Sequence, residues 1–235
     1  SGVINIKTKK GTQTGYNGSI SLSYIQANYP KTPNSINMNY RKGKTNIFGQ
    51  YSYTHWEGFS KIYIDRFFGK VSDDEFESLF DQFSFQRFSA NTHSFRLGVD
   101  YYANKKTTLG ISVNGTLNKN NSLGETRSDF LNDNYDLVYY NWARTTSGGP
   151  WRNFATNLNF RTALSKGREI SGDVDGIYYY NKAVQNSDNY NVNPDGSLRG
   201  TNPGDPPNPF LLKGNLPGTI HILTGKLDYS HPLKK

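Results

Sequence analysis

Apolar and polar residues alternate with a period of two along eight separate segments of the chain. The clearest segment is 95–101, where Phe95, Leu97 and Val99 alternate with polar residues such as Arg96. This alternation is the signature of a β-strand with one apolar and one polar face. The eight predicted strands are residues 16–24, 36–41, 47–54, 95–101, 109–117, 153–164, 170–180 and 220–229. The pattern predicts an all-β chain folded as an antiparallel meander.

The predicted strands are joined by connections of two kinds. Tight turns rich in Gly, Asn and Lys recur at intervals of about 62 to 65 residues, near Gly43, Lys105, Gly167 and Pro232. The other connections are long, and we expect loops over residues 55–91, 120–150 and 182–217. Short turns at one end and long loops at the other are typical of a transmembrane β-barrel, with periplasmic turns and extracellular loops. A soluble sandwich rarely sorts its loops by length in this way.

The amino-acid composition also favours a membrane barrel. Hydrophobic residues make up 34% of the 235 residues and the mean hydropathy is -0.75, yet aromatic residues reach 14%. A disordered chain lacks such rings, whereas barrels carry aromatic girdles and a polar lumen. No stretch approaches the roughly 18 apolar residues of a membrane helix. The absence of cysteine excludes disulfides and thiolate metal sites within the chain.

The net charge of +8 raises the question of a nucleic-acid partner. The basic residues are distributed among the predicted turns, however, at Lys42 and Lys44, Lys105 and Lys106, Lys166 and Arg168, and Lys234 and Lys235. Because this distribution makes no single basic face, we predict no nucleic-acid partner.

Residues 72–83 carry a helix signal inside the first long loop. Ser72 and Glu75 form a capping box, and Phe76, Leu79, Phe80 and Phe83 follow with helical spacing. The sequence predicts a short amphipathic helix here. Its apolar face either packs on neighbouring loop phenylalanines or serves as a lid or docking helix for a surface partner.

Two groups of residues are candidates for contact with a ligand. The first group lies in the second long loop and consists of Tyr139, Tyr140, Trp142 and Arg144. Their aromatic faces and guanidinium could stack on a sugar ring or contact a peptide. Alternatively, these residues anchor an interface or form the core of the loop. On the polar faces of the strands, the residues expected to line the inner wall are Arg41, Arg96, Asp100, Asn157, Arg161, Asp173 and Asp175.

The chain offers little for catalysis or metal binding. His93 and Ser94 are neighbours on a predicted strand, so their side chains point to opposite faces and cannot share a proton. The other histidines lack ligand spacing, and no glutamate follows Asp173 and Asp175 at the distance that a calcium loop requires. We therefore predict no catalytic residue, no metal, no cofactor and no enzymatic activity.

Four segments of the sequence resemble the TonB-dependent-receptor-like outer-membrane β-barrel family of Bacteroidetes. They are GVINIKTKKG at 2–11, NYRKGKTNIFGQYSY at 39–53, GVDYYANKKTTLGISV at 98–113 and GKLDYSHPLKK at 225–235. The resemblance implies that residues 1–12 are the end of a plug domain and that residues 13–235 are the N-terminal part of a barrel of 22 strands. It also implies an outer-membrane location and energy supplied by a TonB-type protein.

The leading hypothesis is thus a fragment of a TonB-dependent transporter that takes up a nutrient through a plugged barrel. Its partners would be outer-membrane lipid, the TonB-type energising protein and a surface lipoprotein. The main alternative is a barrel with a structural or surface-interaction role and no transport. A closed eight-stranded barrel acting enzymatically on lipid A is a third, weaker alternative. The fragment hypothesis predicts that the first and last strands do not pair with each other.

Overall fold

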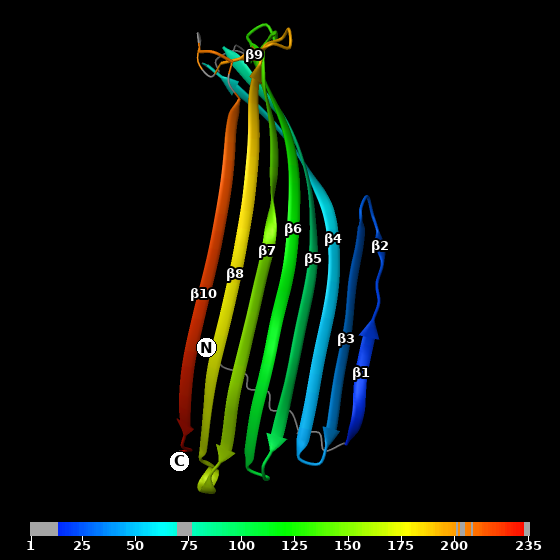
Figure 1. Cartoon of the computed structure of the whole chain (residues 1–235), viewed down its shortest axis with the longest axis vertical. Coiled ribbons are helices and arrows are strands. Elements are labelled where there is room, and N and C mark those ends of the chain that lie inside the picture. The colour runs from blue at the N-terminus through cyan, green and yellow to red at the C-terminus, as the bar shows by residue number, and fades with distance from the viewer. Residues whose placement is uncertain (1–13, 70–76, 201, 203–204, 208, 233–235) are drawn as a thin grey trace.

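Ten strands form a single antiparallel sheet in the computed structural model of the chain (Figure 1). The structure describes residues 14–69, 77–200, 202, 205–207 and 209–232. The strands are β1 (Gly15–Ser21), β2 (Ile25–Gln26), β3 (Pro30–Lys42), β4 (Thr45–Phe68), β5 (Ser78–Tyr102), β6 (Thr107–Asn132), β7 (Leu137–Ala163), β8 (Glu169–Val192), β9 (Leu198–Arg199) and β10 (Phe210–Ser230). Within these ranges one 3₁₀ turn, η1 (Ser165–Gly167), accompanies the strands. The predicted plug segment 1–12 lies outside the described residues.

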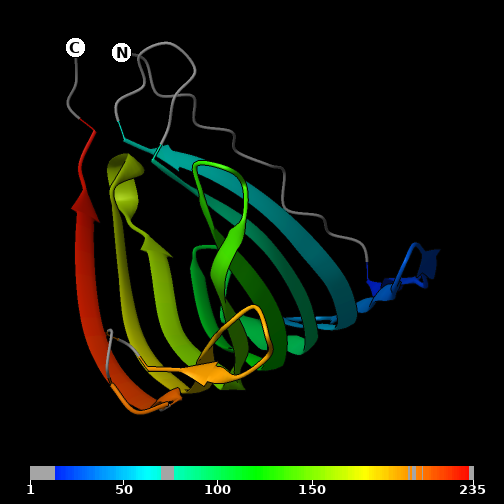
Figure 2. The same ribbon diagram turned by 90° about the horizontal axis from the view of Figure 1, so that it is seen from above.

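The sheet is an open meander. Its order is β1-β3-β4-β5-β6-β7-β8-β10, with β2 beside β3 and β9 beside β8, and every pairing is antiparallel. Figure 2 shows a curved wall whose two edge strands, β1 and β10, lie on opposite sides. The predicted all-β antiparallel meander is therefore confirmed, and so is the absence of pairing between its first and last strands.

All the connections at one end of the sheet are short, as predicted. Gly43 occupies the turn between β3 and β4 with φ of 56°, and Gly167 ends η1 with φ of 72°, a backbone region that favours glycine. Between β5 and β6, the Asn104 side-chain oxygen accepts hydrogen bonds from the amides of Lys106 at 2.8 Å and Thr107 at 2.9 Å. Asn therefore closes this turn through its own side chain.

The three long loops that the sequence predicts are for the most part strand, so that prediction was wrong. β4 continues to Phe68 and β5 begins at Ser78, so most of 55–91 is paired. β6 and β7 leave only residues 133–136 between them, and β8 continues to Val192 before β10 begins at Phe210. The ladder bonds use backbone groups that every residue except proline has. They therefore continue where apolar and polar side chains are mixed on both faces, as at Lys61, Ile62 and Tyr63 of β4, and where no regular alternation marks a strand.

The amphipathic helix predicted at residues 72–83 is also wrong where the structure describes it. Leu79, Phe80 and Phe83 belong to β5, while residues 72–76 lie outside the described residues. Pairing of β5 with both β4 and β6 satisfies its backbone on two sides. Phe80 also contacts the ring of Phe130 on β6, with ring centroids 5.1 Å apart. Tertiary pairing thus overrides a local helical spacing.

The sheet is one layer thick and has almost no hydrophobic core. Among the described residues, the buried apolar side chains are Leu79 and Val192, and no side chain is fully buried. Leu223 is 81% exposed and Leu227 is 74% exposed. A single layer with such exposure obtains little stability from internal apolar burial, so its apolar face requires an external apolar medium or partner.

One face carries an apolar belt, which we define as four successive cross-strand rows centred on Phe95, Leu97, Val99 and Tyr101 of β5. Directly paired residues share a face, so each row can be followed from strand to strand. The Val99 row contains Tyr40, Ile47, Ile111, Leu158 and Val174. Rings lie towards both borders of the belt, at Tyr101 and Phe160 on the turn side and at Tyr51, Phe95, Phe154 and Tyr178 on the other. We call this side of the sheet the belt face.

Candidate functional site

The face opposite the belt collects all seven residues that were predicted to line an inner wall. Cross-strand pairing places Arg41, Asp100 and Asp173 in one row, Asn157 and Asp175 in the next, and Arg96 and Arg161 in the rows on either side. Strand alternation alone placed each residue on the polar side of its own strand. The register then brings side chains from β3, β5, β7 and β8 into one surface, which we call the polar wall.

Amide and carboxylate groups on the polar wall hold one another by hydrogen bonds. The Asn157 side-chain amide donates to Asp175 at 2.7 Å and accepts from Asn159 at 2.7 Å. The Thr224 hydroxyl on β10 donates to the same carboxylate at 3.4 Å. At the turn end, Arg161 forms an ion pair with Glu169 at 2.6 Å. The wall is thus an ordered strip of groups that can form hydrogen bonds with a polar solute.

Two arginines on the polar wall lie over aromatic rings. The guanidinium of Arg41 is 4.6 Å from the ring centroid of Tyr102, and that of Arg96 is 5.5 Å from the centroid of Phe48. The Phe48 ring in turn covers Gly98, where a larger residue would overlap it. These stacked cations keep their charge accessible while their side chains are held in place.

The four aromatic and cationic residues predicted as a loop site do not form one site. All four lie on strand β7, not in a loop, and Tyr140, Trp142 and Arg144 are on the belt face. Tyr139 points to the opposite face, where its ring stacks on Phe130 at 4.3 Å between centroids. The sequence could not show this separation, because a loop imposes no alternation of faces.

Tyr140 and Trp142 line a shallow cavity on the belt face, far from the turns. The cavity has a volume of about 450 Å³ and is lined by Arg127, Tyr140, Trp142, Tyr190, Val192, Gly196 and Leu198. Trp142 lies 5.6 Å from Tyr190 between ring centroids. Arg127 lies 4.3 Å above the Tyr140 ring and is held by Asp129 at 2.7 Å, and this hydrogen bond raises the pKa of Arg127. Rings beside a fixed guanidinium suit a planar or sugar-like ligand.

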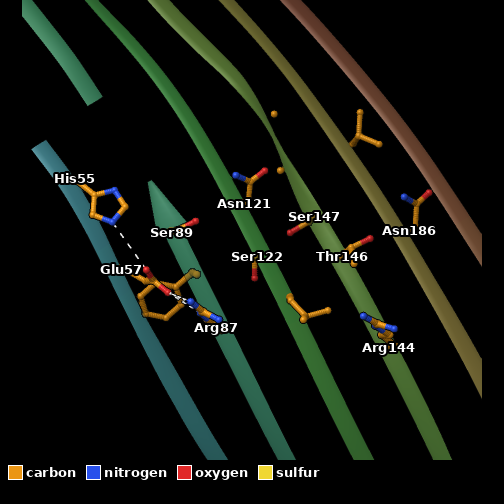
Figure 3. A pocket seen from close by; sticks show the side chains of 15 residues that line it. His55, Glu57, Arg87, Ser89, Asn121, Ser122, Arg144, Thr146, Ser147 and Asn186 are labelled. Carbon is orange, nitrogen blue, oxygen red and sulfur yellow. Dashed lines mark hydrogen bonds and ion pairs between the residues drawn. The ribbon is translucent and has the colours of Figure 1, made fainter. Parts of the chain in front are cut away.

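A larger groove of about 690 Å³ crosses the belt face from β4 to β8, between the belt and this cavity (Figure 3). Glu57 lies between two basic side chains, in contact with the Arg87 guanidinium and 3.9 Å from the His55 imidazole. Across the groove, Arg144 lies 3.9 Å from Glu125, and both side chains are half exposed. Sequence reasoning missed the groove because its residues are spread over five strands and become neighbours only through the register.

Three carboxylates lie side by side near the end of the sheet opposite the turns. Asp65 pairs with Asp81, and Asp81 pairs with Asp129, so the three residues form one row on β4, β5 and β6. Partial desolvation and then the neighbouring charges of Asp65 and Asp129 raise the pKa of Asp81. Like charges directly opposite each other destabilise a sheet, so this end is less stable when all three are ionised.

In the part of the chain that the structure describes, no group of three or more His, Asp or Glu side chains is arranged to hold a metal ion. His93 accepts or donates a hydrogen bond with the Tyr51 hydroxyl at 2.8 Å, on the face opposite Ser94. Across the same residues, no helix has the length and hydropathy needed to span a membrane. Comparisons with protein-family models, curated proteins and solved structures gave no match to this chain.

Proposed function

We propose that this chain forms part of the wall of an outer-membrane β-barrel of the TonB-dependent receptor type, with the belt in the lipid and the polar wall towards the lumen. The observation that carries the proposal is a belt of four rows on one face of the sheet, in which apolar side chains predominate and charged side chains are nearly absent. Among the described residues, the four rows of the belt contain one charged side chain, that of Lys42 beside the turn.

The height of the belt fits a bilayer. A transmembrane strand needs roughly 9 to 11 residues when tilted by about 45°. On β5 the belt covers 95–101, and the mixed row next to it adds His93, so 93–101 has about the length of such a strand. The exposed apolar surface is too extensive for a soluble single-layer sheet, whereas lipid tails would cover it. The aromatic rings at its borders fit the aromatic girdles of such barrels.

The open edges support a barrel that contains additional strands. Among the described residues, β1 pairs only with β3, and β10 pairs with β8 along all of Phe210–Ser230, so each leaves one edge without a described partner. Unpaired backbone groups are costly in lipid, which accepts only helices and closed barrels. In this proposal, further strands close the barrel around a lumen wide enough for the ion pairs and stacked arginines of the polar wall.

In this proposal the barrel transports a nutrient. An outer-membrane location, a plug contributed in part by residues 1–12, and coupling to a TonB-type protein follow from the sequence resemblance. The polar wall offers carboxylates, amides and arginines along a path for a hydrophilic solute. The alternative is a barrel of the same design that binds a surface lipoprotein or another partner without transport.

Cysteine labelling tests which face is in lipid, because the chain contains no cysteine. In the intact protein expressed in cells, Arg96→Cys on the polar wall should react with a membrane-impermeant maleimide. Leu97→Cys on the belt, one residue away, should be protected until detergent is added. Equal reactivity of the two cysteines in intact membranes would overturn the proposed facing.

Transport is tested separately by genetics. Deletion of the gene for the intact protein and deletion of the TonB-type energising gene are compared across a panel of single-nutrient media. Transport predicts that both strains lose growth on the same nutrient, with each strain restored by its own gene. A growth defect in neither strain, together with a loss of surface binding in the first alone, favours the structural role.

A further inference from the structure

Three cationic side chains form a compact cluster on the belt face. Leu117 pairs with Arg152 and Arg152 pairs with Tyr180, so Lys119 on β6 and Lys182 on β8 are each diagonal to Arg152 on β7. Diagonal neighbours in an antiparallel sheet lie about 7–8 Å apart. All three cations are exposed. We call Lys119, Arg152 and Lys182 the cation cluster.

The cluster sits directly beside the belt border that is farther from the turns. Tyr178 lies in the last row of the belt, Arg152 and Tyr180 lie in the next row, and Lys119 and Lys182 lie one row beyond. Arg152 also lies 5.9 Å from the Tyr180 ring centroid. Because the aromatic border marks the level of the lipid headgroups in the proposed barrel, the cluster would lie at that level.

No carboxylate neutralises the cluster among the described residues. The arginines farther along the same face have acidic partners, since Arg87 contacts Glu57 and Arg127 is held by Asp129. No ion pair within the described ranges includes Lys119, Arg152 or Lys182. Like charges held this close on one face of a sheet repel one another, so an anion from outside the chain would relieve the repulsion.

We propose that Lys119, Arg152 and Lys182 bind the phosphorylated headgroup of a membrane lipid in the leaflet next to this border of the belt. This inference rests on the proposed barrel and adds a lipid-binding site to it. Arginine binds phosphate through a bidentate fork, and each lysine adds a point charge. The lipid tails would lie along the apolar side chains below, while Tyr178 and Tyr180 contact the boundary between tails and headgroup.

The position of the cation cluster beside the belt favours a lipid headgroup over a free phosphate ion as the bound anion. A soluble anion needs only the three charges, whereas a lipid also gains from the exposed apolar surface that begins one row away. Each cation near a charged membrane surface contributes roughly a fivefold change in affinity. Removing two of them should therefore weaken lipid retention about thirtyfold.

The test uses the intact protein reconstituted in nanodiscs of phosphatidylcholine with a minor fraction of bis-phosphorylated lipid A. Native mass spectrometry counts the lipid A molecules that stay bound after transfer to mild detergent. The variant pair is Lys119→Gln with Lys182→Gln. The matched control is Lys61→Gln with Lys213→Gln, which removes the same charge from the same face farther from the belt.

The wild-type protein and the control pair should retain lipid A, and the cluster pair should lose most of it. Equal loss in both pairs, or no retention by the wild-type protein after successful reconstitution, would overturn the lipid site while leaving the barrel proposal intact. Failure to reconstitute would overturn both. Inorganic phosphate added at constant ionic strength should not displace the lipid, and displacement would assign the cluster to a free anion instead.

Discussion

Replacement of Ile111 by arginine is the most direct energetic test of the belt. Ile111 lies on β6 between Val99 and Leu158 in a row near the middle of the belt, and it is 50% exposed in the single sheet. If that exposed half faces hydrocarbon, an arginine there loses its hydration or drags water and headgroups inward. The cost at the bilayer midplane is about 2–4 kcal/mol. A loss of this size is far larger than a surface substitution normally produces.

The matched control is Ser112→Arg, one residue along the same strand. Ser112 pairs with Gly98 and Asn157 on the polar wall, with Asp175 in the same row. An arginine here meets water and acidic or amide groups, so its cost should stay below about 1 kcal/mol.

Reversible urea unfolding of the intact protein in lipid vesicles measures both costs. Tryptophan fluorescence follows the transition, and the free energy of unfolding comes from the midpoint and the slope. Ile111→Arg should lower that free energy by several times more than Ser112→Arg. Equal losses in the two variants, or a larger loss in Ser112→Arg, would refute the assignment of the belt face to lipid.

Three further predictions concern other parts of the sheet. Gly115→Ala should cost about 1–3 kcal/mol in the same unfolding assay, because its new methyl would lie 2.6 Å from the Phe95 ring and 2.9 Å from Phe154, whereas Gly225→Ala, with no atom nearby, should cost little. The pKa of Asp81 is raised in the folded state, so the stability of the end of β5 should fall as the pH rises above the ordinary pKa of 3.8. Asp81→Asn should therefore slow amide exchange at that end at neutral pH but not below pH 3.8. An effect of the substitution that does not depend on pH would contradict this reasoning. Ser84→Pro should speed amide exchange in β4 and β6 beside it, because it places proline in a central strand, and unchanged exchange would indicate a loop.

The sequence by itself determined the eight strands of the main sheet path and the residues that close their short turns. Segment 95–101 could be predicted because its side chains alternate between apolar and polar types, as a strand with one apolar and one polar face requires. Asn104 and Gly167 mark their turns because few other residues satisfy the backbone there. Alternation also assigned each predicted wall residue, such as Asp175, to the polar side of its own strand.

Only the tertiary structure decided how far the strands extend and which side chains meet. Beyond the belt apolar and polar side chains are mixed on both faces, as at Lys61, Ile62 and Tyr63, so the side chains carry no period of two. The strands continue there because their backbone groups pair along their length. Register then separated Tyr139 from Tyr140 and brought Lys119, Arg152 and Lys182 together from three strands. A shift of one residue in the pairing register would move every side chain of a strand to the opposite face of the sheet. The register is set by pairing between strands, which the sequence alone does not show.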